Sequence, residues 1–271
     1  MQFLSGHHLN AAIEDIIRSA ESELLIVSPY IKLHERTIEA LKTLIDKPKV
    51  RVTLIFGKAS GDKTTTFDKD SIAFLKTLPN IEIAHRQNLH AKFYANEDSS
   101  TLCSLNLYNY SQDVNFEAGY LINSTSSKAN KLEQDEAWGY FNEIFDGAEL
   151  MFDKEAEFES RLLRAKKYIS SKVIFDALDN LPKDKAKPES KVKVKAKMGP
   201  TGYCIASGKE MRYNIEKPLC RAEYRLWLGE GGDKDYSMKY CHFSGAQSKG
   251  KTTFSKPILH KHWQEASQIS N

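Results

Sequence analysis

The sequence is poor in cysteine and has no long apolar run. Its 271 residues include four cysteines, at positions 103, 204, 220 and 241, which do not suggest a disulfide framework. No stretch reaches the roughly 18 apolar residues of a membrane-spanning helix. The first residues lack the basic segment followed by an apolar one that marks a secretory signal. These absences predict a cytoplasmic protein with no membrane partner.

Charge is unevenly distributed along the chain, although the net charge is only +3. Residues 181 to 271 contain 18 Lys and Arg against nine Asp and Glu, whereas the first 180 residues contain 21 and 27. An acidic part, net −6, is therefore joined to a basic part, net +9. Such a split is typical of a chain whose basic part meets a polyanion, although a solvated lysine-rich linker without a partner would give the same count.

Hydrophobic patterns predict strands that alternate with helices over the first 150 residues. We expect strands at 23–28, 50–57, 81–84, 89–95, 101–106 and 117–123, and helices at 9–22, 36–46, 68–78 and 128–147. A further helix is expected at 153–178, because no glycine or proline interrupts it. This order predicts an α/β fold with a mixed, mostly parallel sheet flanked by helices.

A lysine-alternating stretch predicts the domain boundary. Residues 183–197 read KDKAKPESKVKVKAK, and self-repulsion among these lysines favours an extended linker. We therefore expect one domain at 1–180, a linker at 181–200 and a small basic module at 201–271.

Two pairs of polar residues carry the chemistry of the first domain. His90 and Lys92 lie two positions apart in a predicted strand, so their side chains share a face, and Ser104 and Asn106 repeat this spacing in the next strand. An imidazole, an ammonium, a hydroxyl and an amide suit a phosphate diester. The imidazole can attack phosphorus while the other groups stabilise charge on the oxygens.

These residues resemble the signature of the phospholipase D superfamily, in which H-x-K is followed by an acidic residue and by S-x-N. Here the signature reads His90-Ala91-Lys92, then Glu97-Asp98, then Cys103-Ser104-Leu105-Asn106, with a later acidic residue at Glu117. The chain departs from the pattern in two ways: Glu97 occupies the usual place of the aspartate, a mainly structural residue in the family, and Cys103 replaces a glycine. The resemblance covers roughly residues 1–150.

The resemblance implies a phospholipase D-like fold and a mechanism that needs no metal or other cofactor. Family members with one H-x-K motif generally pair two chains, so it implies a homodimer with one active site at the interface. His90 of one chain would form a phosphohistidine, and His90 of the other would act as acid and then base. Lys92, Asn106 and Ser104 would bind the phosphate oxygens, and Glu117 would orient the histidine.

The soluble, single-motif form resembles the bacterial nuclease branch, so a DNA endonuclease is the main hypothesis, with DNA favoured over RNA. A phospholipase D-type lipid phosphodiesterase and a non-catalytic nucleic-acid-binding module are the alternatives. The basic tail could track a nucleic-acid backbone, which would make binding dependent on salt.

The C-terminal segment resembles a C-x-x-C-type zinc module in which every second cysteine has changed, to Ser207, Glu223 and Ser244. Cys204, Cys220, Cys241 and His242 offer four donors, the number that a structural zinc site requires. The adjacency of Cys241 and His242 is awkward for one tetrahedral ion. We therefore favour a degenerate module without metal, held by its apolar residues: Tyr203, Tyr213, Leu219, Tyr224, Trp227, Tyr240 and Phe243.

Overall fold

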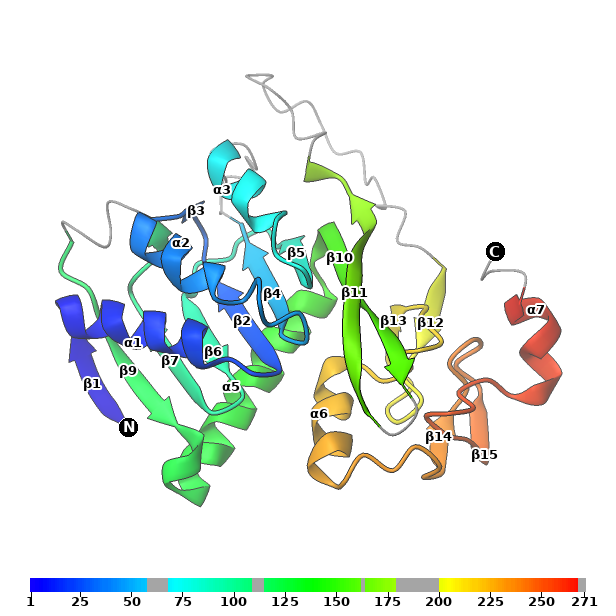
Figure 1. The fold of residues 1–271 in the computed structure, drawn as a ribbon. Helices are drawn as coiled ribbons and strands as arrows, with labels where there is room; N and C mark the ends of the chain where they lie inside the picture. The colour runs from blue at the N-terminus through cyan, green and yellow to red at the C-terminus, as the bar shows by residue number, and fades with distance from the viewer. Residues whose placement is uncertain (58–67, 109–114, 162–163, 179–199, 268–271) are drawn as a thin grey trace, which may run out of the picture. The chain divides into compact units, whose positions relative to one another are not determined.

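The computed structural model describes residues 1–57, 68–108, 115–161, 164–178 and 200–267 (Figure 1). It divides into two compact units, 1–189 and 190–271. The division falls inside the stretch expected to be a linker, most of which lies outside the described residues. Within the described ranges, no helix is both long and apolar enough to cross a membrane.

One nine-stranded sheet organises the first unit, in the order β1-β9-β7-β6-β2-β4-β5-β10-β11. The strands are β1 (Gln2–Ser5), β2 (Glu23–Val27), β4 (Arg51–Phe56), β5 (Ile81–His85), β6 (Phe93–Asn96), β7 (Ser99–Cys103), β9 (Ala118–Asn123), β10 (Glu149–Arg161) and β11 (Arg164–Asp176). The predicted mixed α/β fold is confirmed. Its parallel share is smaller than expected, because only β2–β4 and β4–β5 pair in parallel and the other neighbours are antiparallel.

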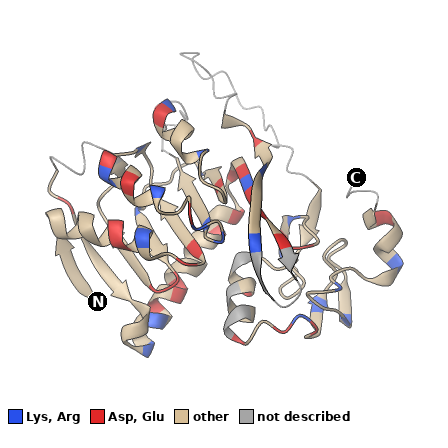
Figure 2. Ribbon diagram, viewed as in Figure 1, with Lys and Arg blue, Asp and Glu red and all other residues tan. Residues whose placement is uncertain are grey.

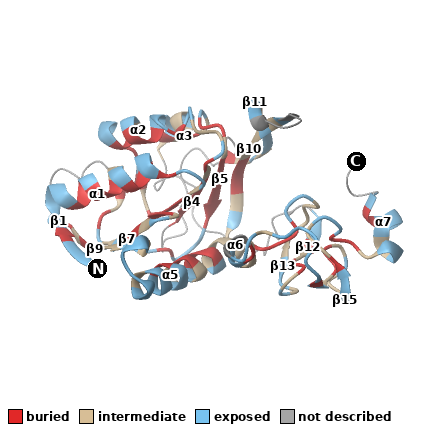
Figure 3. Ribbon diagram, turned by 60° about the horizontal axis from the view of Figure 1, so that its bottom comes forward, coloured by how far each residue is buried: buried red, intermediate tan, exposed pale blue. Residues whose placement is uncertain are grey.

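Three helices cover one face of the sheet: α1 (Gly6–Ser19), α2 (Glu35–Lys42) and α3 (Lys69–Leu75). Their buried stripes are apolar at helical spacing, as in Ile13, Ile16 and Ile17 of α1. These residues pack against one alternate set of strand side chains, including Ile26 and Leu54. The buried stripes face the sheet in Figure 3.

The opposite face is covered by α5 (Lys128–Asp146). Trp138 and Phe141 of this helix pack against the other alternate set of strand side chains, which includes Val27 and Phe93. The rings of Phe93 and Phe141 stack with centroids 4.6 Å apart. Strands that are apolar on both faces, such as β2 and β4, therefore lie in the centre of the sheet.

The helix expected at 153–178 is wrong, because this segment forms most of the antiparallel hairpin β10–β11. Alternation explains the strands: Phe152 is buried and pairs with Ile83 of β5, whereas farther along the hairpin Phe158 pairs with Tyr168. The absence of glycine and proline permits a helix but does not require one. β-branched residues such as Val173 and Ile174 favour the strand.

The described part of the second unit contains two short hairpins and three helical segments. These are β12 (Thr201–Tyr203) with β13 (Glu210–Arg212), β14 (Met238–Tyr240) with β15 (Gln247–Thr252), α6 (Arg221–Gly229), the 3-10 helix η3 (His260–His262) and α7 (Trp263–Ser267). Two small apolar clusters hold it together. One contains Cys204, Cys220 and Trp227, and the other contains Cys241 and Ile258.

Candidate active site

Three adjacent strands bring the predicted site residues to one edge of the sheet. β9, β7 and β6 are neighbours and pair antiparallel, so the start of β6, the end of β7 and the start of β9 lie together. Lys92 precedes β6 directly, Ser104 follows β7 directly, and Glu117 precedes β9 directly. Both motif strands are shorter than the sequence predicted, so His90 and Asn106 lie in segments just outside the ladder.

A turn positions His90. Asn88 adopts a left-handed backbone conformation with φ 66°, which asparagine tolerates better than most residues. The next residue, Leu89, is buried in the cluster beneath α5. Its burial anchors the segment, while the His90 side chain is exposed at the surface.

Lys92 lies beside His90, with Nζ 3.5 Å from His90 Nε2. The lysine is 8% exposed, and its backbone carbonyl accepts a hydrogen bond of 3.1 Å from Cys103 N, which extends the β6–β7 ladder by one residue. Burial lowers the pKa of Lys92, and the negative charge of Glu117 partly offsets this effect. The result is a nearly buried cation held against an exposed imidazole.

Ser104 and Glu117 form the second part of the site. Ser104 Oγ donates a hydrogen bond to Glu117 Oε2, and the same Oγ accepts one of 3.1 Å from Ala118 N. Asn115 Nδ2 donates to Glu117 Oε1 at 3.3 Å. The Glu117 carboxylate is 8% exposed, and its hydrogen bonds among the described residues go to Ser104 and Asn115, with none to His90 of the same chain.

Asn106 lies where the chain leaves β7. The Tyr94 hydroxyl donates to Leu105 O at 2.9 Å, and Leu107 N donates to Ser28 Oγ at 2.9 Å, so the residues on both sides of Asn106 are fixed. Asn106 Oδ1 is buried and has no hydrogen-bond partner among the described residues. A buried amide oxygen without a partner is costly, and such atoms in native proteins commonly mark strain, a catalytic role or a site for a water or an ion.

A close approach of two strands shapes the floor of the site. A Cβ added at Gly119 of β9 would lie 2.5 Å from Cys103 Cβ, so glycine is required where β9 passes β7. Burial raises the pKa of Cys103 to about 12, so this residue is a neutral thiol at physiological pH. Asn115 and Gly119 were not predicted as site residues. The sequence indicated them only through their position, because each lies two residues from Glu117.

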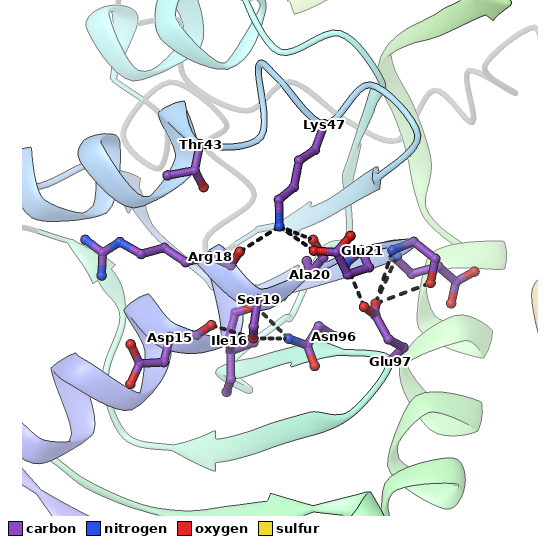
Figure 4. A network of polar contacts seen from close by, with 12 residues as sticks. Asp15, Ile16, Arg18, Ser19, Ala20, Glu21, Thr43, Lys47, Asn96 and Glu97 are labelled. Carbon is purple, nitrogen blue, oxygen red and sulfur yellow. Dashed lines mark hydrogen bonds and ion pairs between the residues drawn. The ribbon is translucent and has the colours of Figure 1, made fainter. Parts of the chain in front are cut away.

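Glu97 has a structural position in this fold, at the opposite end of β6 from His90. Its carboxylate accepts hydrogen bonds from the backbone N–H groups of Glu21 at 2.6 Å, Ser22 at 3.4 Å and Glu23 at 3.2 Å, where β2 begins (Figure 4). Lys47 Nζ closes the same turn by donating to the carbonyl groups of Arg18 and Ala20. This position fits the structural role expected for the acidic residue that follows H-x-K.

An apolar row beside the site is left uncovered by α5. Cross-strand pairing places Phe93, Leu102, Tyr120 and Phe3 side by side on β6, β7, β9 and β1. Phe93 is buried, but Leu102, Tyr120 and Phe3 are 57%, 53% and 59% exposed. The rings of Phe3 and Tyr120 pack edge to face with their centroids 5.5 Å apart. Leu102 lies two residues from Ser104, so the row adjoins the site.

The four zinc donors considered for the second unit are not brought together. His242 Nε2 accepts a hydrogen bond of 2.9 Å from Asn214 N, and His242 Nδ1 lies 2.7 Å from Tyr203 O, so both ring nitrogens are occupied. Cys204 and Cys220 share one cluster, and Cys241 lies in another. In the described parts of the chain, no three His, Cys, Asp or Glu side chains are placed to hold a metal ion.

Comparisons with known proteins agree with the motif. Residues 13–140 match the family model described as cardiolipin synthase, PLD-like domain. No curated protein matches the chain.

Three similar solved structures each cover 55% of this chain. They are the phospholipase D family member Nuc from Salmonella typhimurium (17% identity, 97% of that chain, TM-score 0.42), NucT from Helicobacter pylori (15%, 98%, 0.45) and phosphatidylserine synthase from Haemophilus influenzae (18%, 39%, 0.41).

All three TM-scores lie below 0.5, so the assignment depends on the family model and on the site. The matched residues include His90 and Lys92, together with Ser104, Asn106 and Glu117, which surround the same edge of the sheet. Residues 13–140, which lie in the first unit, therefore form a PLD-like domain of the phospholipase D superfamily.

Proposed function

We propose that the protein is a metal-independent phosphodiesterase that cleaves DNA at a site shared by two copies of the chain. The observation that carries the proposal is the contact between the exposed His90 imidazole and the buried Lys92 ammonium, 3.5 Å apart at an edge that also holds Ser104 and Asn106. A nucleophile beside a fixed cation suits attack on a phosphate diester.

Two imidazoles are needed for the full reaction. Nε2 of one His90 attacks phosphorus, which forms a P–N bond and breaks the P–O bond to the leaving group. The second imidazole gives its proton to the leaving oxygen and then removes a proton from water, which attacks phosphorus and breaks the P–N bond. Lys92 balances the charge on the phosphate oxygens, and Asn106 donates hydrogen bonds to them.

A second copy of the chain would supply the second imidazole. Glu117 supports this arrangement, because it bonds Ser104 and Asn115 within its own chain and retains acceptor capacity for Nδ1 of the other copy's His90. We place the contact between the copies on the exposed row of Leu102, Tyr120 and Phe3, which adjoins the site. Apolar side chains exposed this close together favour association.

DNA is the favoured diester because of the charge on the second unit. Residues 236–264 contain five lysines and no carboxylate, and Lys239, Lys249 and Lys251 of the β14–β15 hairpin are exposed. Lys and Arg are drawn blue in Figure 2. Lysines of this kind neutralise phosphates without reading the base sequence.

The decisive experiment is cleavage of plasmid and single-stranded DNA in EDTA by wild type and by His90→Ala. We expect cleavage by wild type and a loss of at least a thousandfold in the variant, because the proposed mechanism uses this imidazole as nucleophile and as acid. Hydrolysis of phospholipid vesicles without DNA cleavage would show a phospholipase D-type lipid phosphodiesterase instead. Equal DNA binding by both proteins without turnover of either substrate would show a non-catalytic binding module.

The dimer is tested separately with Tyr120→Glu. Two carboxylates would face each other across the proposed contact, so we expect a monomer by sedimentation and a loss of cleavage. The matched control is Tyr140→Glu, because Tyr140 is also more than half exposed but lies on α5. A Tyr120→Glu protein that still sediments as a dimer would place the contact elsewhere.

A further inference from the structure

The second unit contains the same structural motif twice. Tyr203-Cys204-Ile205-Ala206-Ser207-Gly208 and Tyr240-Cys241-His242-Phe243-Ser244-Gly245 both read Y-C-x-x-S-G, and each follows a short strand. Each ends in a glycine with positive φ, 74° at Gly208 and 66° at Gly245. The glycine N–H donates to the cysteine carbonyl at 2.8 Å in the first motif and 2.9 Å in the second. We call these turns the first and second knuckle.

Backbone hydrogen bonds around the knuckles are also duplicated. Each cysteine N–H donates to a carbonyl five residues ahead, at 2.8 Å and 2.9 Å. The residue after each cysteine donates to a proline carbonyl, Ile205 to Pro218 at 3.0 Å and His242 to Pro257 at 2.9 Å. The two knuckles therefore occupy equivalent environments.

The knuckles also bind each other reciprocally. Tyr203 N donates to His242 O at 2.7 Å, and Tyr240 N donates to Ile205 O at 2.8 Å. A Cβ added at Gly208 would lie 3.0 Å from the Tyr240 ring, and one added at Gly245 would lie 2.8 Å from the Tyr203 ring. Each tyrosine thus covers the glycine turn of the other knuckle.

This equivalence identifies four matching positions beside each knuckle. The proline segments read Lys217-Pro218-Leu219-Cys220 and Lys256-Pro257-Ile258-Leu259, so Cys220 corresponds to Leu259 and Glu223 to His262. The first set is Cys204, Ser207, Cys220 and Glu223; the second set is Cys241, Ser244, Leu259 and His262. The cysteine spacing of each knuckle is that of a C-x-x-C zinc site with a serine in place of its second thiolate.

Hydrogen bonds join side chains within each of the two sets. In the first set, Ser207 Oγ lies 3.9 Å from Cys220 Sγ, and Cys204 is buried in the same cluster as Cys220. In the second set, Cys241 Sγ lies 3.5 Å from His262 Nδ1 and accepts from Leu259 N at 3.4 Å. Ser244 Oγ lies 3.0 Å from the same His262 Nδ1.

Neither set meets the requirements of a tetrahedral zinc site. Such a site takes four thiolate, imidazole or carboxylate ligands. The first set has a hydroxyl at one position, and the second has a hydroxyl and an alkyl side chain. The zinc implied by the resemblance to a C-x-x-C module does not fit these residues.

We infer that the second unit is a duplicated knuckle that folds without metal, held by thiol, hydroxyl and imidazole hydrogen bonds and by reciprocal tyrosine–glycine packing. The inference is independent of the proposed nuclease activity, because it concerns only residues 203–262.

The test restores the lost ligands in the full-length protein. Ser207→Cys with Glu223→Cys completes four thiols at the first set, and Glu216→Cys with Ser267→Cys adds two exposed thiols outside both sets. Zinc content is measured by elemental analysis after dialysis, and cobalt coordination is measured by its tetrahedral absorption spectrum. Thermal unfolding of each protein is followed with and without EDTA.

We expect wild type and the Glu216/Ser267 variant to retain almost no zinc. Each of these two proteins should unfold at the same temperature with and without EDTA. The Ser207/Glu223 variant should retain one zinc per chain and unfold at a lower temperature once the metal is removed. Stoichiometric zinc in wild type with a fall in its melting temperature in EDTA would overturn the inference. So would a Ser207/Glu223 variant that binds no more metal than the control, because the knuckle geometry would then be wrong.

Discussion

At the scale of single residues, Lys92 combines burial with positive charge. Its side chain is 8% exposed, and burial is the main cause of its lowered pKa. Holding a cation in such a position costs stability that a neutral side chain would not cost. A cation held at this cost in stability suits the anion binding that we propose for Lys92.

We predict that Lys92→Met abolishes phosphodiester cleavage and raises the free energy of unfolding by about 1 kcal/mol, the scale of burying a polar group with partial compensation. The variant keeps the length and apolar stem of lysine but removes the charge. Urea unfolding followed by circular dichroism measures the change. A variant less stable than wild type would show that Lys92 stabilises the fold.

The difference in the free energy of unfolding between wild type and Lys92→Met should depend on pH. A lowered pKa in the folded protein means that the unfolded chain binds more protons, so the stability of wild type rises as pH increases through the folded pKa of Lys92. The advantage of Lys92→Met should therefore be largest near neutral pH and shrink toward pH 10.5, the ordinary lysine value. Unfolding curves of both proteins across this range provide the check.

The sequence was informative about the residues of the motif. The two-residue spacing predicted that His90 lies near Lys92 and that Ser104 lies near Asn106. The structure brings both pairs to one edge of the sheet. It did not predict that Glu117 bonds Ser104, because this contact joins residues 13 apart through strand pairing. It also did not predict that His242 is buried with both ring nitrogens bonded to backbone groups.

At the scale of elements, strand pairing rather than local propensity decided the segments that were mispredicted. The segment 153–178 lacks helix breakers, yet β5 offers a free edge to which the start of β10 pairs. Antiparallel hairpins on both sides of the short parallel core likewise make the sheet less parallel than expected. The apolar stripe located α1 because its periodicity is local, but the helix expected at 9–22 begins and ends three residues earlier, at Gly6–Ser19.

The approach of β7 and β9 gives a prediction at this scale. Gly119→Val should destabilise the first unit by about 2 kcal/mol, because its Cβ would overlap Cys103 Cβ and the strands must move apart. The same movement displaces Ser104 from Glu117, so cleavage should fall as well. Melting temperature and cleavage rate are measured together.

Gly139→Ala is the matched control, because Gly139 lies in α5 with nothing within 4 Å of an added Cβ. Alanine in a helix is more stable than glycine by roughly 0.5–1 kcal/mol, so this variant should melt at a higher temperature. Equal destabilisation by both substitutions would exclude the close-approach argument.

At the scale of the whole molecule, the two parts of the chain differ in charge. The first 180 residues are net −6 and the remainder is net +9. An acidic domain repels a polyanion, so the attraction to DNA that we propose would come from the basic part. We propose that the first unit cleaves the phosphodiester and that the second unit supplies most of the affinity for DNA.

Charge reversal tests this division. We predict that Lys239→Glu with Lys251→Glu weakens DNA binding and reduces the magnitude of the slope of log K against log salt by about 1.4–1.8, because each phosphate contact contributes roughly 0.7–0.9 to that slope. The control is Lys69→Glu with Lys128→Glu, which changes the charge equally at the first residues of α3 and α5, where an acidic side chain is favourable. An unchanged slope in the first variant would mean that the hairpin does not contact phosphates.

The reciprocal packing of the two knuckles has a consequence for how the second unit unfolds. Each knuckle supplies the cover of the other, so neither retains its tyrosine contact or its cross-knuckle hydrogen bond when the other opens. Opening one half therefore exposes the other, and the pair behaves as a single cooperative element despite its small size. A duplicated unit of this kind has no half that a protease can remove while leaving a folded remainder.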